Sequence, residues 1–264
     1  MKINSSGVSN TLNKVQQQQD NLLKKLAAAR RINSAADDAA GLQIAGRLDS
    51  SVAAKAQGER NLYDGISLSR VYEQALQGIN DNYAELGRLA VAAGNGIYGT
   101  QERQALQKDA DALLDNAKQI INTTEFAGKK LFNADASLGF STGTDSISLS
   151  TTDVGAALQN QNAFSLDLSS PAGAGEALNR IEQARNFIST LQAEAGAEAN
   201  RFASAARSLG GQQVAESSAR SRITDLDYAR ASADRAVANF QTQASVSVAM
   251  QARISSERAL SLLS

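Results

Sequence analysis

Apolar residues recur at alternating spacings of three and four over residues 8–32. The stripe consists of Leu12, Val15, Gln19, Leu22, Leu26 and Ala29, of which only the glutamine is polar. This heptad spacing places all six side chains on one face of an α-helix, because the helix has about 3.6 residues per turn. The pattern therefore predicts an amphipathic helix with one face available for packing.

The same periodicity predicts further helices, separated by turn signals. We expect them over residues 42–93, 101–123, 175–209 with a continuation beyond Gly210 and Gly211, and 227–263. The glycine-rich GNGIYGT ends the first of these, and a short turn there makes it antiparallel to the next. The stripe in residues 42–93 consists of Tyr72, Leu76, Ile79, Tyr83, Leu86 and Ala90, and the stripe in residues 101–123 of Leu106, Ala110, Leu113, Ala117 and Ile120. In the final helix Val237, Phe240, Ala244, Val248 and Ala252 share one face. Such stripes are typical of buried contacts between helices, of the same chain or of another copy.

Residues 133–174 have a different composition from the helical parts. Gly, Ser, Thr and Asn become frequent, and the runs SISLS and FSLDLSS alternate apolar and polar residues as strands do. Pro171 closes the segment. The chain is therefore predicted to be mainly α: a long antiparallel helical bundle or coiled coil formed by its N- and C-terminal halves, with a small irregular or β-containing central insert.

This pattern predicts three regions. We expect a core domain from the terminal helices, a rod domain from the long helices, and a small variable insert exposed at the surface. Their respective boundaries are residues 1–42 with 221–264, residues 43–132 with 175–220, and residues 133–174.

Two similar breaks interrupt the helical pattern near the two ends of the chain, in RRINSAADDAAGL and in SRITDLDYA. Ser34 with Asp37, and Thr224 with Asp227, have the spacing of a capping box, which satisfies unpaired N–H groups where a helix begins. If the chain folds in half and lays its ends side by side, the two breaks face each other.

Facing breaks would bring opposite charges together. We expect Arg30 and Arg31 to meet Asp225 and Asp227, and Asp37 and Asp38 to meet Arg220 and Arg222. Exposed pairs of this kind contribute about 0–1 kcal/mol each. They would set the register of the two halves more than their stability.

The amino-acid composition argues against most kinds of catalytic and metal-binding site. The 264 residues include no cysteine and no histidine, so the usual general base and the commonest metal ligands are missing. Three pairs of aspartates, Asp37–Asp38, Asp109–Asp111 and Asp225–Asp227, are interpreted as helix caps and surface pairs. We therefore expect no enzyme activity and no cofactor. A net charge of −1 favours neither nucleic acid nor an anionic membrane. No apolar run is long enough for membrane insertion, and the N-terminus lacks the apolar core of a classical secretion signal.

The terminal helices carry an apolar stripe that a lone pair of helices cannot fully bury. Packing supplies most of a short helix's stability, so these helices must pack against the long helices or against copies of the same protein. Contacts between unlike faces of identical copies propagate into open helical filaments. Two hypotheses follow: a self-assembling filament subunit and, as the alternative, a soluble helical coiled-coil adaptor or binding protein.

Several segments resemble bacterial flagellin and occur in that family's order: RRINSAADDAAGLQIAGRL, NLYDGISLSRVYEQALQGIN, LAVAAGNG, INTTEFAGKKLF, ANRFASAARSL, SARSRITDLDYA and ALSLLS. The resemblance covers about residues 1–132 and 175–264 and implies a structural subunit of the flagellar filament, the helical propeller for swimming. It implies that the terminal helices form the inner tube, the adjoining helices a second shell, and the insert an outward projection. One departure is the closing stretch QARISSERALSLLS, which lacks the proline that many flagellins have there.

The resemblance also implies partners, a location and assembly residues. The partners are other flagellin copies in a homo-polymer, the hook–filament junction proteins, the filament cap protein and an export chaperone that binds the C-terminal helix. The location is the extracellular filament, reached through the flagellar type III apparatus. We expect subunit assembly to use Leu12, Val15, Leu22, Leu26, Arg31, Asp37, Asp38, Arg222, Asp227, Val237, Phe240, Val248, Leu260, Leu262 and Leu263.

One further set of positions follows from the resemblance. Flagellins recognised by the host innate-immune receptor share an arginine, a leucine before the Asn-Gly turn and an acidic residue on the next helix. Aligning LAVAAGNG places these on Glu85, Leu89 and Asp109. Because Glu85 reverses the charge of the arginine, we expect weak recognition by that receptor.

Overall fold

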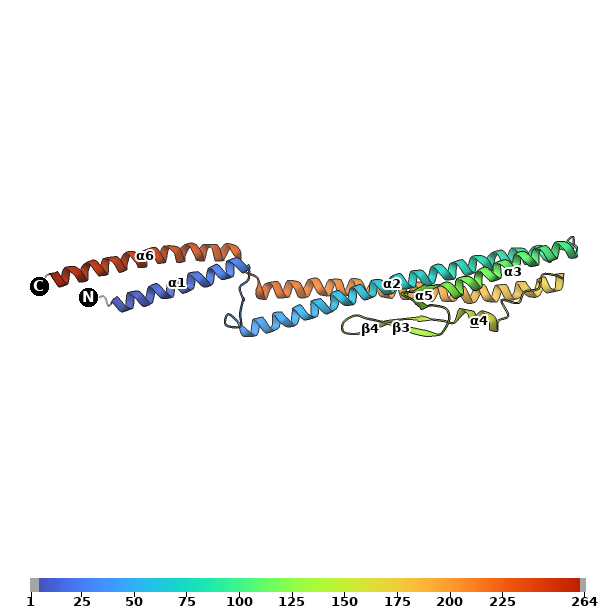
Figure 1. Ribbon diagram of the computed structural model, residues 1–264, viewed down its shortest axis with the longest axis horizontal. Helices are drawn as coiled ribbons and strands as arrows, with labels where there is room; N and C mark the ends of the chain where they lie inside the picture. Colours follow the sequence, from blue (N-terminus) through green and yellow to red (C-terminus); the bar gives the residue numbers. More distant parts are fainter. Residues whose placement is uncertain (1–4, 262–264) are drawn as a thin grey trace. The chain divides into compact units, whose positions relative to one another are not determined.

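The computed structural model describes residues 5–261, and within them the side chains of residues 10, 13–251 and 254. It is mainly helical (Figure 1), and the predicted fold class is confirmed. The helices are α1 (Ser5–Ala28), α2 (Ala39–Ala93), α3 (Thr100–Thr123), α4 (Val154–Asn160), α5 (Pro171–Thr224) and α6 (Tyr228–Ser261).

Helix ends differ from the predicted ones where local backbone geometry intervenes. α1 stops at Ala28, earlier than predicted, because Ala29 adopts a positive φ of 53° that a helix does not accommodate. α5 begins at Pro171, whose fixed φ suits the first turn of a helix. The same helix continues through Gly210 and Gly211 without interruption, because single glycines weaken a helix without ending it.

The insert contains one small hairpin, β3–β4, and one helix, α4, and a second small hairpin, β1–β2, lies just before it. β1 (Glu125–Phe126) pairs with β2 (Lys129–Lys130), and β3 (Ala136–Ser141) pairs antiparallel with β4 (Ser146–Thr151). SISLS is thus a strand as predicted, whereas FSLDLSS forms no strand. Its leucines, Leu166 and Leu168, are buried in the core, and their burial accounts for the alternation without a partner strand. α4 was not predicted, and the Asp153 carboxylate caps it by accepting from the Ala156 N–H at 2.7 Å.

The chain forms two compact units. The terminal unit contains the chain up to Val52 and from Val214 onward, and the central unit contains Ala53–Gln213. The division falls inside α2 and α5, so both units include parts of these two helices. The roles of core, rod and insert expected from the sequence remain predictions.

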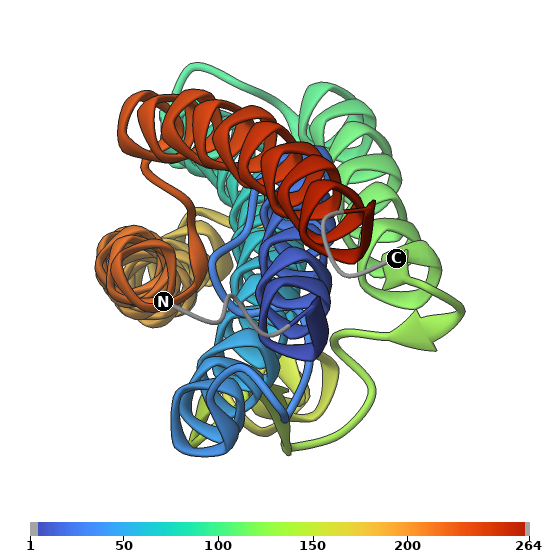
Figure 2. The same cartoon turned by 90° about the vertical axis from the view of Figure 1, so that its left-hand side faces the viewer.

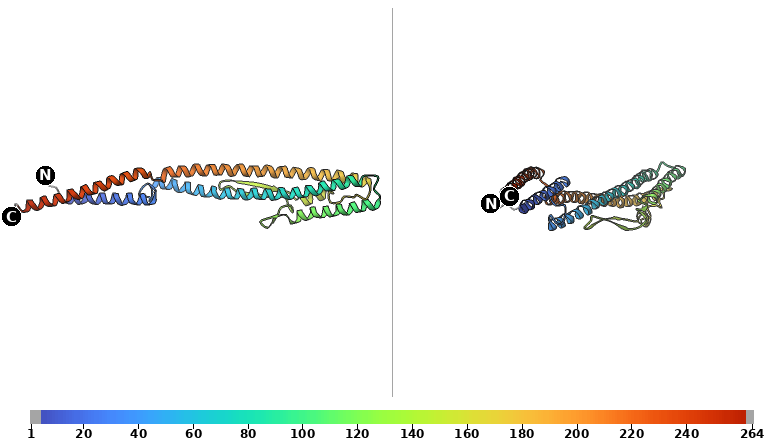
Figure 3. Two further views of the ribbon diagram at one scale, coloured as in Figure 1. Left: turned by 90° about the horizontal axis from the view of Figure 1, so that it is seen from above. Right: turned by 60° about the vertical axis from the view of Figure 1, so that its left-hand side comes forward.

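The core of the central unit is built from the predicted helical stripes. Figure 3 shows α2, α3 and α5 running alongside one another there. The stripe predicted in α2 is buried throughout, from Tyr72 to Ala90. In α3 Ala110 and Ala117 are buried as predicted, but Leu114 and Ile121 are buried in place of Leu113 and Ile120, which are only partly buried. The helical period thus identified the core stripes to within about one residue.

A close backbone contact positions the β3–β4 hairpin on α2. A side chain at Gly58 would overlap the backbone of Thr142, at the hairpin turn. Next to this contact, Asn61 Nδ2 donates to the Ser141 carbonyl at 2.9 Å. The Phe140 and Phe202 rings meet edge to face with centroids 5.2 Å apart. The hairpin is therefore fixed on α2 and α5 by one glycine, one amide and one aromatic pair.

Candidate functional site

The two breaks lie against each other in the terminal unit. Arg30 and Asp225 form an antiparallel β-bridge, flanked by two backbone hydrogen bonds. The Arg31 N–H donates to the Thr224 carbonyl at 2.7 Å, and the Leu226 N–H donates to the Ala29 carbonyl at 3.2 Å. We call residues 29–38 and 224–227 the junction. The expectation that the breaks face each other is correct, and main-chain groups hold them together.

In the first break, two aspartates bind backbone N–H groups. Asp37 Oδ2 accepts from the N–H groups of Asn33 and Ser34 at 3.1 and 3.0 Å, and Asp37 Oδ1 pairs with Lys25 at 3.3 Å. These hydrogen bonds, the backbone ones first, lower the pKa of Asp37 from 3.8 to about 2. The N-cap of α2 is Asp38, which accepts from the Gly41 N–H at 2.8 Å. Ser34 and Asp37 are thus hydrogen-bonded to each other as predicted. They order the loop and do not cap a helix, because α2 begins only at Ala39.

In the second break, the predicted capping box is wrong. Asp227 is itself the cap of α6, because its Oδ1 accepts from the Arg230 N–H at 3.0 Å. The Thr224 hydroxyl donates to the Arg220 carbonyl and to the Asp225 carboxylate, both at 3.0 Å, and does not bind a described N–H group of α6. Hydrogen bonds from Ser221 and Thr224 lower the pKa of Asp225. Thr224 and Asp227 have the spacing of a capping box, but α6 begins at Tyr228, directly after Asp227, so Thr224 is too far from the helix to cap it.

Of the predicted charge pairs across the breaks, Arg30 and Asp225 do meet, through their main chains, and the charge of Arg30 contributes to lowering the pKa of Asp225. No salt bridge joins any of the predicted partners among the described side chains. The Arg31 guanidinium donates to the Ile223 carbonyl, and Arg222 Nε donates to the Ser218 carbonyl at 3.3 Å. Arg220 pairs with Asp49 of α2 at 2.6 Å. The physical reason is that the junction carboxylates are already hydrogen-bonded, Asp37, Asp38 and Asp227 to backbone N–H groups and Asp225 to the Ser221 and Thr224 hydroxyls.

α1 and α6 lie side by side in the terminal unit (Figures 1 and 2). Val15 of α1 is buried, and Leu22 and Leu26 are partly buried. Between the helices, Gln19 Nε2 donates to Asn239 Oδ1 at 2.9 Å. The heptad stripe predicted from the sequence is therefore the face of α1 that packs.

On α6 the packed face consists of small residues. Ala231 and Ala238 are buried, and Thr242, Ser245 and Ala249 are partly buried. These positions recur at heptad spacing, and that spacing is the signal that could have identified the face from the sequence. Small residues leave room for the leucines of α1 to approach closely.

The opposite face of α6, which carries the predicted apolar stripe, is exposed, so no described part of the same chain covers it. The exposed fractions are 55% for Val237, 72% for Phe240 and 55% for Val248. Two residues not named from the sequence, Met250 and Ile254, are 61% and 48% exposed on the same helix. We call these five residues the outer face of α6. The side chains of Leu12 and Leu260, and all of Leu262 and Leu263, lie outside the described residues.

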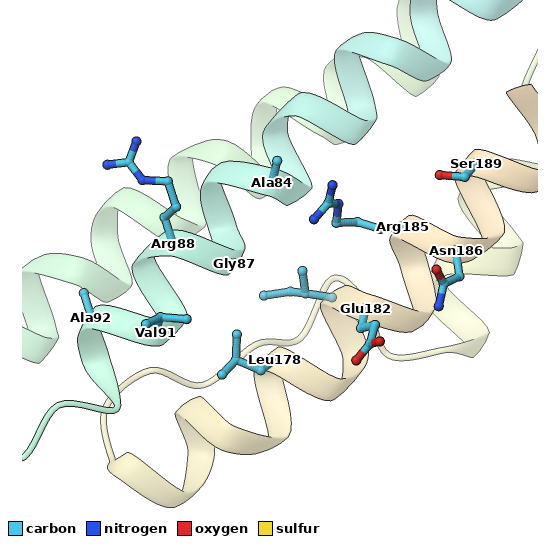
Figure 4. A pocket seen from close by; sticks show the side chains of 11 residues that line it. Ala84, Gly87, Arg88, Val91, Ala92, Leu178, Glu182, Arg185, Asn186 and Ser189 are labelled. Carbon is cyan, nitrogen blue, oxygen red and sulfur yellow. The ribbon is translucent and has the colours of Figure 1, made fainter.

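A second feature is a groove of about 950 Å³ between α2 and α5 in the central unit (Figure 4). Its lining includes Gly87 and Arg88 of α2 and Ile181 and Glu182 of α5. Glu85, the position compared with a receptor-binding arginine, pairs with Arg88 at 3.3 Å. Leu89 packs partly buried against the core and Asp109 is exposed on α3. No hydrogen bond or ion pair joins these three predicted positions among the described side chains.

The described residues offer little for catalysis or for metals. No three acidic, cysteine or histidine side chains in the described part are placed to hold a metal ion. Likewise, none of its helices is long and apolar enough to cross a bilayer. What the site can do chemically is to present an apolar helix face beside a hydrogen-bonded junction.

Comparison with known families gives two matches that together cover most of the chain. The profile described as "Bacterial flagellin N-terminal helical region" matches residues 2–137. The profile described as "Bacterial flagellin C-terminal helical region" matches residues 178–263. The unmatched residues between them, 138–177, contain most of β3, all of β4 and α4, and the first residues of α5.

Curated relatives agree with these matches. The "Flagellar filament 30.7 kDa core protein" of Treponema maltophilum is 27% identical over 263 residues, with 92% of this chain and 91% of that protein covered. The flagellin of Serratia marcescens is 35% identical over 147 residues, covering 54% of this chain and 42% of that flagellin. The chain thus spans nearly the whole Treponema protein but less than half of the Serratia one.

Solved structures share the fold. Bacillus cereus flagellin matches with a TM-score of 0.52 at 23% identity, covering 57% of this chain and 88% of that one. A putative flagellar hook-associated protein from Vibrio parahaemolyticus matches with a TM-score of 0.61 at 13% identity, covering 72% of this chain and all of that one. At these identities the likeness concerns the arrangement of helices.

Proposed function

The chain belongs to the bacterial flagellin family, and on that premise we propose that its copies join into the filament through the outer face of α6. It is a structural subunit of the flagellar filament and not an enzyme. The adaptor alternative is not favoured, because both helical regions match the family of filament subunits.

The observation that carries the proposal is the exposure of Phe240, Val237 and Val248 on α6. Each large apolar side chain moved from water to a packed interface gains about 1.5–3 kcal/mol. α1 already covers the small-residue face of α6, so another copy must cover the outer face. A contact of this face with a different face of the next copy repeats without closing, which produces a helical polymer.

The remaining assembly residues have separate roles in this proposal. Val15, Leu22 and Leu26 hold α1 on α6 and so present the outer face in the right orientation. Arg31, Asp37, Asp38, Arg222 and Asp227 act within one copy, because each bonds to the main chain near the junction. Their substitution is expected to affect assembly through the geometry of α1 and α6.

The test is seeded polymerisation of purified chains, followed by sedimentation and electron microscopy. Phe240→Gln is expected to keep the helix content of the wild type, because the side chain is exposed in the single copy. It is expected to raise the critical concentration for polymerisation by about tenfold or more, since burial of the ring is lost. Gln241→Ser, at the next exposed position of α6, is the matched control and should polymerise normally. Equal polymerisation of Phe240→Gln and the control would refute the role of the outer face.

Finer assignments belong to the same proposal and are supported by family membership. We propose that residues 1–42 and 221–264 form the filament core, that the long helices form a rod around it, and that residues 133–174 face outward. Hook–filament junction proteins, the cap protein and an export chaperone are the proposed partners. Export through the flagellar type III apparatus would deliver the subunit to the extracellular filament.

Weak recognition by the innate-immune receptor remains an expectation. The position of the recognised arginine is occupied by Glu85, whose carboxylate pairs with Arg88 on the same helix. A receptor surface shaped for an arginine would meet a negative charge at that point.

A further inference from the structure

The turn between α2 and α3 contains an exposed Asn-Gly sequence. Asn95 and Gly96 are both exposed, and there is open space around the Gly96 Cα, with no atom within 4 Å of a Cβ built there. The main-chain nitrogen of a residue after asparagine can attack the side-chain amide carbon when the two come together. A glycine at that position hinders the attack least, because it has no side chain.

A hydrogen bond folds the Asn95 side chain over the following peptide. Asn95 Oδ1 accepts from the Ile97 N–H at 3.2 Å. The ring closed by this bond includes both Asn95 Cγ, which would be attacked, and the Gly96 nitrogen, which would attack. Holding two reacting groups within one small ring raises their effective concentration strongly.

The same hydrogen bond stabilises the charge that the attack creates. When nitrogen adds to Cγ, negative charge develops on Oδ1, and the Ile97 N–H already points at that oxygen. A donor placed in advance at a developing oxyanion lowers the barrier to the reaction.

Arg103 acts on the nucleophile through the peptide group. Its Nη2 donates to the Asn95 carbonyl at 3.1 Å, and the Tyr98 N–H donates to the same oxygen at 3.3 Å. Its Nε donates to the Ala93 carbonyl at 2.9 Å, which anchors the guanidinium. A cation on this carbonyl draws electron density from the Asn95–Gly96 amide and so makes the Gly96 N–H easier to deprotonate.

We propose that Asn95 is a site of spontaneous deamidation, with Arg103 as a positioning residue for the reaction. Water or hydroxide removes the Gly96 amide proton, and the nitrogen forms a bond to Asn95 Cγ. The Cγ–Nδ2 bond breaks, and ammonia leaves with a proton from water to give a cyclic succinimide. Water then opens either carbonyl of the ring, giving aspartate or isoaspartate, with no oxidation or reduction. This inference does not depend on the proposed function.

The products change the turn in a defined way. Either product places a new carboxylate beside the Arg103 guanidinium, and isoaspartate also adds a methylene to the main chain. The turn holds Ile97, which is 87% exposed, and Tyr98, which is 40% exposed. The modification would therefore move two exposed apolar side chains at the end of the α2–α3 pair.

The experiment uses the purified full-length chain, kept as monomer at neutral and at mildly alkaline pH. Peptide mapping by mass spectrometry measures conversion of each asparagine to its acid, and isoaspartyl methyltransferase labelling measures isoaspartate. Asn33, an exposed loop asparagine followed by Ser34, is the internal control. We expect Asn95 to convert about tenfold or more faster than Asn33, with a rate that rises with pH.

Two variants test the mechanism. Gly96→Ala has room for its side chain and a φ outside the left-handed region, so circular dichroism should show an unchanged fold while conversion slows about tenfold. Arg103→Gln should slow conversion severalfold, and Arg103→Lys should restore part of the rate. Conversion at Asn95 no faster than at Asn33, or unaffected by Gly96→Ala, would overturn the proposal. Equal rates in Arg103→Gln and the wild type would overturn the role of Arg103.

Discussion

At the scale of single residues, the junction is organised by carboxylates that bind main-chain N–H groups. Asp38 and Asp227 each cap a helix, and Asp37 orders the loop before α2. The N–H groups at a helix start have no partner within the helix, so a nearby carboxylate satisfies them and also interacts favourably with the helix dipole. These aspartates therefore act inside one copy of the chain, and two predictions about their carboxylates follow.

The first prediction concerns how the Asp37 carboxyl makes the stability of the fold depend on pH. Its pKa is about 2 in the folded chain against an ordinary 3.8. A carboxyl with a lowered folded-state pKa stabilises the fold above its unfolded-state pKa, and this contribution is lost as the pH falls through the folded-state value. We expect the thermal midpoint of the terminal unit to fall between pH 3.8 and about pH 2, and Asp37→Asn to reduce that fall. Circular dichroism melts measure it, with Asp109→Asn on α3 as the control.

The second concerns the cap of α6. Asp227→Ala removes the acceptor for the Arg230 N–H and is expected to lower the free energy of unfolding by about 0.5–2 kcal/mol. Asp227→Asn keeps an acceptor oxygen and should stay close to the wild type. Urea unfolding followed by circular dichroism compares the three chains. If Asn is as damaging as Ala, the charge of Asp227 is required and capping alone is insufficient.

At the scale of elements, the hairpin β3–β4 depends on a position in α2 that has no side chain. Gly58 lets the backbone of Thr142 rest directly on the helix, and Gly143 in the turn has a φ of 91° next to the Ala54 carbonyl. Both glycines are needed because a Cβ would collide or be strained there. The hairpin is thus placed by backbone contact more than by its own two strands, which alone are only marginally stable.

We predict that Gly58→Ala lowers the free energy of unfolding by about 1–3 kcal/mol, because the added methyl must displace the hairpin backbone. Gly196→Ala on α5 has no atom within 4 Å of the new Cβ and should stabilise the chain by about 0.4–1 kcal/mol. Tyrosine fluorescence during urea unfolding reports on both variants, since Tyr72 and Tyr83 are buried in the central unit. Equal effects of the two substitutions would contradict the packing argument.

At the scale of the whole molecule, burial differs greatly between the two units. The central unit has a continuous core that runs from Leu62 to Leu209. Among the described side chains of the terminal unit, the buried apolar ones are Val15, Ile32, Ala45, Ala231 and Ala238, most of them alanine. Local stability follows apolar burial, so the terminal unit is the part of a single copy that gains most from neighbours.

Hydrogen exchange tests this difference. In dilute monomer we expect the amides of α1 and α6 to exchange at least about a hundredfold faster than those of α2 between Leu76 and Leu86. In assembled filaments the α6 amides should become protected, because binding to neighbours stabilises the folded form. Mass-spectrometric exchange of both forms measures this. Protection of α6 that is equal in monomer and filament would mean that the terminal unit does not need other copies.

Local pattern was enough to predict the long helices and much of the core of the central unit, although not the short helix α4. The stripe from Tyr72 to Ala90 is buried as its spacing requires, because the helical period follows from backbone geometry alone. The meeting of the two breaks also followed from the matched halves of the chain. The family resemblance rested on sequence motifs in order, and two family profiles match the same regions.

Three features were decided only by tertiary contacts. α6 carries small residues on one face and large apolar residues on the other, so periodicity could not tell which face α1 would cover. The junction arginines bind carbonyls because capping had already used the aspartates, a competition that depends on where each helix begins. The leucines of FSLDLSS alternate as in a strand, yet no second strand lies beside them and the helical core buries them instead. In each case the sequence indicates which kind of environment a residue prefers, while the tertiary structure determines which neighbouring group the residue contacts.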